Sequence, residues 1–360
     1  MEFSIQKNRP GNLAFSVPTQ DAMEKAEDEV TALCRDQYRK TFPERTEPFA
    51  QLEMELKQMK ETGMAFHFLV LREIAELSRE EGYPLMANSK WACSLIAFLL
   101  EISQVDPFYL FRSGRFTLGK PYFEIHVASS VFEQITQRLQ KKFGNVDAAE
   151  LHYHTITVIE SDRCERIGKL ARETGKKPSH FGNDVYVSVL HTVADQILSR
   201  ILEAKNDNEE EHLQSVRFAS EMKDITECDF DTLVRIFAYD KGTFSEPKRL
   251  ENLKNPDFFV LREELEEALH ACGMPYEDTQ YLAQKGVWHN TGNDARREED
   301  ARLMKRYHVP QEIRESFSRI WNLQPAYGCI NRLIFMCMEA WYRLNYLTEY
   351  ERICREESFF

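Results

Sequence analysis

Two short segments carry side chains whose types and spacing could bind a metal ion or transfer a proton. Glu124 and His126 stand two residues apart in KPYFEIHVAS, and His152 and His154 stand two residues apart further along the chain. Because residues i and i+2 of a strand point to the same face, each pair would present two ligand-type groups together. A metal site needs a full ligand set, and no third ligand is recognisable beside either pair. We therefore expect partly exposed strand residues here, and no metal.

The common motifs of nucleotide binding and catalysis are missing from the chain. It contains no G-x-x-x-x-G-K-[ST], G-x-G-x-x-G, H-E-x-x-H or G-x-S-x-G. Its eight cysteines include no C-x-x-C pair, so no zinc ribbon is expected. We expect reduced thiols, with Cys93, Cys329 and Cys337 buried on apolar helix faces.

Composition restricts the class of protein. The chain has 360 residues, 42% hydrophobic and 12% aromatic, and 46 basic against 59 acidic side chains give a net charge of −13. This is too apolar for a disordered chain, and no run of about 18 apolar residues could span a membrane. The opening residues show no signal-peptide pattern, so we expect a cytoplasmic protein. The acidity argues against a protein whose whole surface binds polyanions.

The hydrophobic periodicity predicts a small α+β layer followed by helices. The strands are expected at 120–129 and 154–161. The helices of this first part are expected over 21–40, 46–63, 64–81, 91–103 and 131–144. From Asp162 onward only helices are expected. The predicted organisation is a loose leader over 1–25, an α+β domain over 26–185 and a mainly α-helical domain over 186–360.

One stretch near the C-terminal end is locally basic. It contains Arg296, Arg297, Arg302, Lys305 and Arg306. Three acids, Glu298, Glu299 and Asp300, interrupt it. Mixed charge of this kind is typical of a solvated helix face.

The segment EEGYPLMANSKWACSLIAFLLEISQVDPF (80–108) resembles the start of the polymerase palm in bacterial C-family replicative DNA polymerases, specifically the PolC type of DNA polymerase III alpha subunit. EEGY is similar to the family's D-G-Y helix end, and EISQVDPF to its E-I-T-E-V-N-P-type sequence. Further similar segments follow in the family's order. They are 169–190, 216–236, 281–290 and 301–347, the last with the family's V-P pair. The resemblance implies a small polymerase-beta-like palm with a nucleotidyltransferase-type sheet, followed by a helical fingers-like domain.

The resemblance also implies where the metal-binding carboxylates would stand. Two-metal phosphoryl transfer needs several carboxylates to hold two Mg²⁺ ions. The family's P-D-I-D-L motif matches PYFEI, which gives Tyr122 and Glu124, and its L-D-I-L-G motif matches ITVIE, which gives Thr157. One carboxylate of three remains, so no bound metal and no other cofactor is expected.

The phosphate-binding loop is altered as well. The family's G-S-R-G-S-V-G-S-S matches MANSKWACS (86–94), where all three glycines are absent and Asn88, Ser89 and Lys90 replace R-G-S. Glycines let backbone N–H groups approach a phosphate closely, so their loss removes this binding mode. In the fingers, the Lys and His of P-K-A-H are replaced by Ala326 and Gly328.

These losses predict a catalytically inactive homologue, a binding or regulatory module in DNA replication. Its expected partners are DNA, replisome proteins or proteins of a mobile element. The alternative is a minimal DNA-directed polymerase or nucleotidyltransferase that uses Glu124 with two Mg²⁺ and with Asp106, Glu160 or Asp162. The residues expected to contact DNA phosphates are Lys241, Arg296, Arg297, Lys305, Arg306 and Arg319.

Overall fold

The computed structural model divides the chain into two compact units, residues 1–178 with 341–360, and residues 179–340. The described residues are 10–15, 19–43, 47–88, 90–103, 123–143, 154–178, 189–190, 192–194, 196–197, 230–244, 253, 255, 258–285 and 294–357. No helix among them is long and apolar enough to cross a bilayer.

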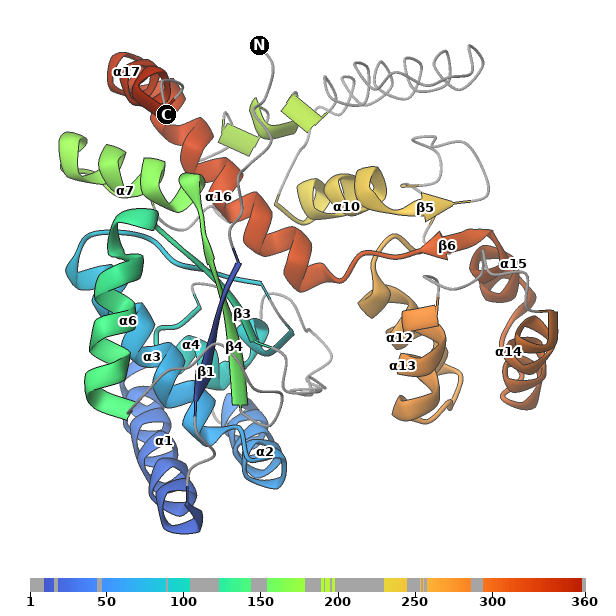
Figure 1. Cartoon of the computed structure of the whole chain (residues 1–360). Coiled ribbons are helices and arrows are strands. Elements are labelled where there is room, and N and C mark those ends of the chain that lie inside the picture. Colours follow the sequence, from blue (N-terminus) through green and yellow to red (C-terminus); the bar gives the residue numbers. More distant parts are fainter. Residues whose placement is uncertain are drawn as a thin grey trace. The chain divides into compact units, whose positions relative to one another are not determined.

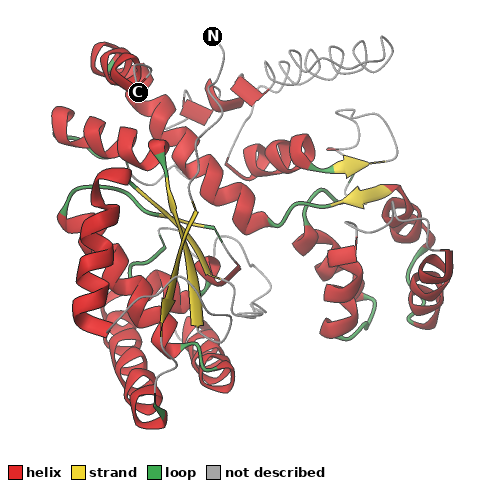
Figure 2. Ribbon diagram, viewed as in Figure 1, coloured by secondary structure: helices red, strands yellow, loops and turns green. Residues whose placement is uncertain are grey.

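A four-stranded mixed sheet forms the centre of the first unit, in the order β1-β4-β3-β2 (Figure 2). The strands are β1 (Pro10–Phe15), β2 (Met86–Ala87), β3 (Phe123–Val127) and β4 (His154–Glu160). The two central strands, β3 and β4, are parallel, and each pairs with an antiparallel edge strand. Parallel neighbours need a crossover connection, and helix α6 (Ser129–Phe143) lies between them in the chain. Both predicted strands are therefore confirmed.

Helices make up most of the rest of the described part of the first unit (Figure 1). They are α1 (Gln20–Thr41), α2 (Glu47–Thr62), α3 (Ala65–Glu80), α4 (Leu95–Leu99), α6, α7 (Asp162–Thr174) and α17 (Leu347–Glu357). Along β3 the side chains alternate: Phe123, Ile125 and Val127 are buried, whereas Glu124 and His126 are partly exposed. One face of the sheet therefore faces the apolar core, and the other carries the polar residues of β3.

The predicted helix ends at Gly63 and Gly82 are confirmed. Both glycines have positive φ, +65° and +79°, which residues with a Cβ rarely adopt. The helix predicted over 91–103 is wrong, because it is divided into a 3₁₀ turn (Lys90–Cys93) and the short α4. The cause is Ser94, whose extended backbone interrupts the helix and whose Oγ accepts the N–H of Ala97 at 2.9 Å.

The loose leader predicted over 1–25 is also wrong in part. Residues 10–15 form strand β1, which pairs with the whole length of β4, and α1 already begins at Gln20. The backbone groups on the outer edge of β4 would be unpaired without β1, and the pairing with β1 supplies their hydrogen-bond partners. Pro10 and Gly11 gave the segment a loop-like composition, which hid the strand.

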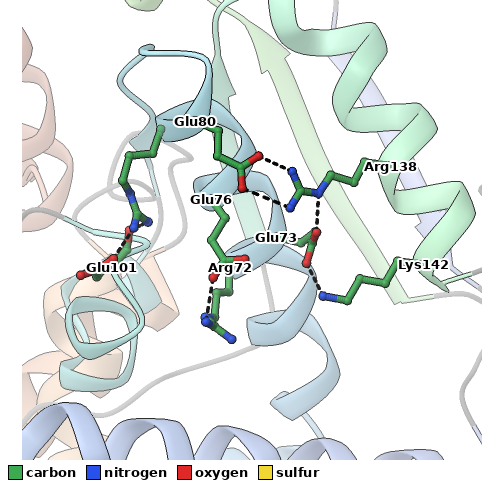
Figure 3. Close-up of polar contacts among 8 residues, drawn as sticks. Arg72, Glu73, Glu76, Glu80, Glu101, Arg138 and Lys142 are labelled. Atoms are coloured by element: carbon green, nitrogen blue, oxygen red, sulfur yellow. Dashed lines mark hydrogen bonds and ion pairs between the residues drawn. The ribbon is translucent and has the colours of Figure 1, made fainter.

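An ion network joins α3 to α6 (Figure 3). Glu73 of α3 is almost buried and accepts hydrogen bonds from Arg138 and Lys142 of α6, the Arg138 Nε lying at 2.5 Å. Arg138 also pairs with the exposed Glu80 at 2.5 Å. Burial raises the pKa of Glu73, but the bonds from Lys142 and Arg138 outweigh burial and leave that pKa below its usual value.

The second unit is mainly helical. Its helices are α10 (Phe230–Lys241), α12 (Arg262–Ala271), α13 (Tyr276–Lys285), α14 (Asp294–Arg306), α15 (Gln311–Arg319) and most of α16 (Ala326–Asn345). The expectation of helices only after Asp162 is wrong, because β5 (Thr243–Phe244) and β6 (Ile320–Asn322) form an antiparallel pair. These strands are too short to show a period in the sequence.

The division into units differs from the predicted boundary over 186–360. The end of the chain belongs with the first unit, where the Tyr342 hydroxyl donates to the carbonyl of Lys176 at 2.7 Å and Arg352 pairs with Glu173. Cys93, Cys329 and Cys337 are buried, as predicted, and none of the three forms a disulfide with another described residue.

Candidate functional site

Glu124 and Thr157 occupy neighbouring positions on the two central strands. They are paired in the register of β3 and β4, and hydrogen-bonded strands lie about 4.8 Å apart. Because alternate residues share a face, His126 lies on the same side of β3 as Glu124. The structure thus brings together two of the three positions that the resemblance implied for carboxylates. The third, Tyr122, lies outside the described residues, as does His152.

The carboxylate of Glu124 is already engaged by neighbouring side chains. Asn88 donates its Nδ2 to Glu124 Oε1 at 2.5 Å, and His126 Nε2 lies 3.0 Å from the same oxygen. The Asn88 backbone N–H also donates to the Glu124 carbonyl at 3.0 Å. The side chains of His126 and Glu124 are only 13% and 16% exposed. One oxygen of the surviving acid, Oε1, is therefore already bonded to protein side chains.

The segment that resembles a phosphate-binding loop is folded against the core. Met86 and Ala87 pair with β3 as β2, and the 3₁₀ turn of Lys90–Cys93 follows. Trp91 is buried and lies 5.2 Å, centroid to centroid, from the ring of Phe123. The Ser94 N–H donates to the Trp91 carbonyl at 2.9 Å. The N–H groups of Asn88 and Ser94 are thus used within the fold. Ser89 lies outside the described residues.

A second carboxylate, Glu55 of α2, holds the far end of this segment, and the sequence interpretation missed it. Its side chain is fully buried, accepts the Ile96 N–H at 3.1 Å and accepts Gln51 Nε2 at 2.7 Å. Burial raises the pKa of Glu55 to about 7, opposed by these bonds from Gln51 and Ile96. The sequence did contain a signal, because Glu55 falls on the apolar helix face between Leu52 and Leu56.

The carboxylates of the alternative hypothesis are not brought to Glu124. Glu160 follows Thr157 by three residues on β4, so its side chain lies on the opposite face of the strand. Asp162 is exposed in the first turn of α7, and Asp106 lies outside the described residues. In the described part of the chain, no group of three or more His, Cys, Asp and Glu side chains could hold a metal ion. The described donors therefore do not fit a two-metal centre.

The residues expected to contact DNA come from three helices of the second unit. Lys241 ends α10 and pairs with Asp240 at 3.0 Å, and Arg319 ends α15. Lys305 and Arg306 are exposed in the last turn of α14, the helix that also contains Arg296 and Arg297. Arg302 lies 3.7 Å from Glu298 on the same helix, so this part of α14 has the mixed charge that the sequence predicted.

The mixed sheet, its parallel central pair and the Glu124 position define a small palm-like α+β domain, followed by a helical domain. The family model for the bacterial DNA polymerase III alpha NTPase domain matches residues 27–232, more than half of the chain. The protein belongs to this family and is a DNA polymerase III alpha-like protein. Comparison with curated protein sequences gives no match.

Proposed function

We propose that this protein is a catalytically inactive member of the DNA polymerase III alpha family, kept as a binding or regulatory module in DNA replication. The observation that carries the proposal is the pairing of Glu124 with Thr157. Metal ions that support phosphoryl transfer are clamped by several carboxylates, and a threonine hydroxyl supplies no charge at the neighbouring position. No metal cofactor is expected.

The loop segment supports the same proposal independently. Nucleotide phosphates are bound by clustered N–H groups of a glycine-rich loop, and here Trp91 packs into the core at this point of the chain. The Ser94 and Ile96 N–H groups donate to Trp91 and to Glu55 instead. These internal contacts on the metal side and on the phosphate side support the proposal that no nucleotidyltransferase centre is kept.

Primer extension tests the loss of catalysis. The full chain is incubated with a primed template, all four deoxynucleotides, and Mg²⁺ or Mn²⁺. We expect no extension product. Template-dependent synthesis that Glu124→Ala abolishes would instead establish the alternative, a minimal polymerase that uses Glu124 with two Mg²⁺.

A salt titration distinguishes DNA from a protein as the binding partner. DNA binding through phosphate contacts weakens steeply with salt, because each contact releases counterions. We expect anisotropy of a labelled primer-template to show weak, salt-dependent binding that falls in the double variant Lys305→Ala/Arg306→Ala. The matched control is Arg352→Ala/Arg355→Ala on α17, where both arginines pair with acids. No binding at low salt would leave replisome or mobile-element proteins as the partners.

A further inference from the structure

The stretch from Asn88 to Ile96 is held at both ends by carboxylates from other parts of the first unit. At its start, Asn88 bonds to Glu124 of β3 through both its backbone N–H, at 3.0 Å, and its side-chain amide, at 2.5 Å. At its end, the Ile96 N–H donates to Glu55 of α2 at 3.1 Å. Two acids from separate elements therefore fix one short segment.

Neither acid lies where a carboxylate is usually found. Glu55 is fully buried, and the side chain of Glu124 is 16% exposed. Burying a carboxylate costs several kcal/mol unless hydrogen bonds replace its water. The bonds from Asn88 and Ile96 supply part of that replacement, so each acid and the residue bonded to it stabilise each other.

The middle of the stretch is anchored as well. Trp91, Ala92 and Cys93 are buried, and the Ser94 Oγ accepts the Ala97 N–H at 2.9 Å. Asn88 and residues 90–96 are thus held both by packing and by hydrogen bonds. A segment that bound phosphate would need N–H groups facing outward.

We propose that Glu124 and Glu55 form an internal clamp, which keeps Asn88 and residues 90–96 in one conformation without any ligand and closes them to added phosphate or cation. The clamp rests on the proposed function, since it is the means by which an inactive palm stays ordered with no nucleotide bound. The carboxylates of Glu124 and Glu55 and the amides that bond to them all belong to the chain itself, so no added ligand takes part.

Hydrogen exchange of the full chain, read by mass spectrometry in the presence of a chelator, tests the clamp. Asn88→Asp keeps the size of the side chain and replaces its amide donor by a second negative charge beside Glu124. We expect amides of 86–97 to exchange about ten-fold faster or more in this variant, with α6 unchanged. The matched control is Gln137→Glu, which sets the same amide-to-acid change beside Glu133 on exposed α6.

Two results would overturn the clamp. One is unchanged exchange of 86–97 in Asn88→Asp, which would mean that core packing of Trp91 alone fixes the stretch. The other is slower exchange of 86–97 in the wild-type chain when millimolar tripolyphosphate with Mn²⁺ is added, since a closed segment gains no protection from these probes. Primer extension by a chain with the expected exchange pattern would defeat the proposed function and leave the clamp standing.

Discussion

Thr157 lies directly beside Glu124 on the parallel strands β4 and β3, so that an uncharged hydroxyl neighbours the single carboxylate on this face of β3. Where two acids stand side by side without a cation, like charges repel each other. The Thr157–Glu124 pair avoids that repulsion, which is consistent with a sheet that folds without metal.

Thr157→Asp is expected to restore the repulsion. Without metal, the free energy of unfolding should fall by about 1 kcal/mol, because two like charges then stand opposite each other across neighbouring strands. Added Mn²⁺ should recover part of this loss, since a cation that binds only the folded chain stabilises it. Thermal unfolding with and without Mn²⁺ measures both effects. Thr157→Asn, which has the shape of aspartate without the charge, should share the loss of strand propensity but lose less stability and show no Mn²⁺ response. An equal Mn²⁺ response in both variants would contradict the prediction.

Glu73→Gln is expected to destabilise the first unit by about 2 kcal/mol, because the partly exposed Arg138 and Lys142 would lose the charged, buried acceptor that they share (Figure 3). The contribution of Glu73 to stability depends on pH, and the direction of this dependence follows from its pKa. Lys142 and Arg138 lower that pKa against the effect of burial. Its contribution is therefore present above the pKa of an unfolded glutamate, about 4.3, and is lost as the pH falls through the lower folded value.

Urea unfolding at neutral and at acid pH measures the Glu73 contribution. Glu80→Gln is the control, because Glu80 pairs with the same Arg138 but its side chain is 57% exposed, and exposed pairs contribute at most about 1 kcal/mol. Equal losses in the two variants would show that burial of Glu73 does not matter.

Glu55→Gln is expected to stabilise the protein at alkaline pH. Burial raises the pKa of Glu55 to about 7 in the folded chain, above its unfolded value. The folded state thus holds a proton that the unfolded state has lost, and stability falls as the pH rises from about 4.5 to 7. The glutamine carbonyl can still accept the Ile96 N–H, so the variant removes the ionisation and keeps this hydrogen bond. At about pH 8 the difference should approach 3 kcal/mol in favour of the variant. Wild type and variant with parallel stability curves between about pH 5 and pH 8 would contradict the raised pKa.

The strands and helix ends that could be predicted rest on local physics. Phe123 to Val127 alternate along one strand, and Gly63 and Gly82 supply positive φ at helix ends. Strand β1 could not be predicted in the same way, because Pro10 disfavours a strand and the pairing with β4 is a long-range contact.

The candidate site also contains features that a local pattern predicts and features that depend on long-range contacts. The likeness of ITVIE to a family motif was enough to place Thr157 on a neighbouring strand in line with Glu124. The bond from Asn88 to Glu124 depends on how β2 packs against β3, which no local pattern records. Glu55 could have been found as an acid on an apolar helix face, but its target, the Ile96 N–H, appears only in the folded chain.

Gly168→Ala tests the packing of α7 in the same unit. In an exposed helix this change would stabilise by about 1 kcal/mol, because glycine is a poor helix former. Here a Cβ at position 168 would lie 2.1 Å from Cδ1 of the Tyr83 ring, which sits against the helix backbone. Tyr83 cannot yield easily, since its hydroxyl receives a hydrogen bond from Arg172 and lies 3.4 Å from Glu165 Oε1. Overpacking should therefore prevail and destabilise the protein by about 1–3 kcal/mol, measured by urea unfolding. In a Tyr83→Leu background the same substitution should cost much less, because the ring is gone, and an undiminished cost there would show that the glycine is needed for another reason.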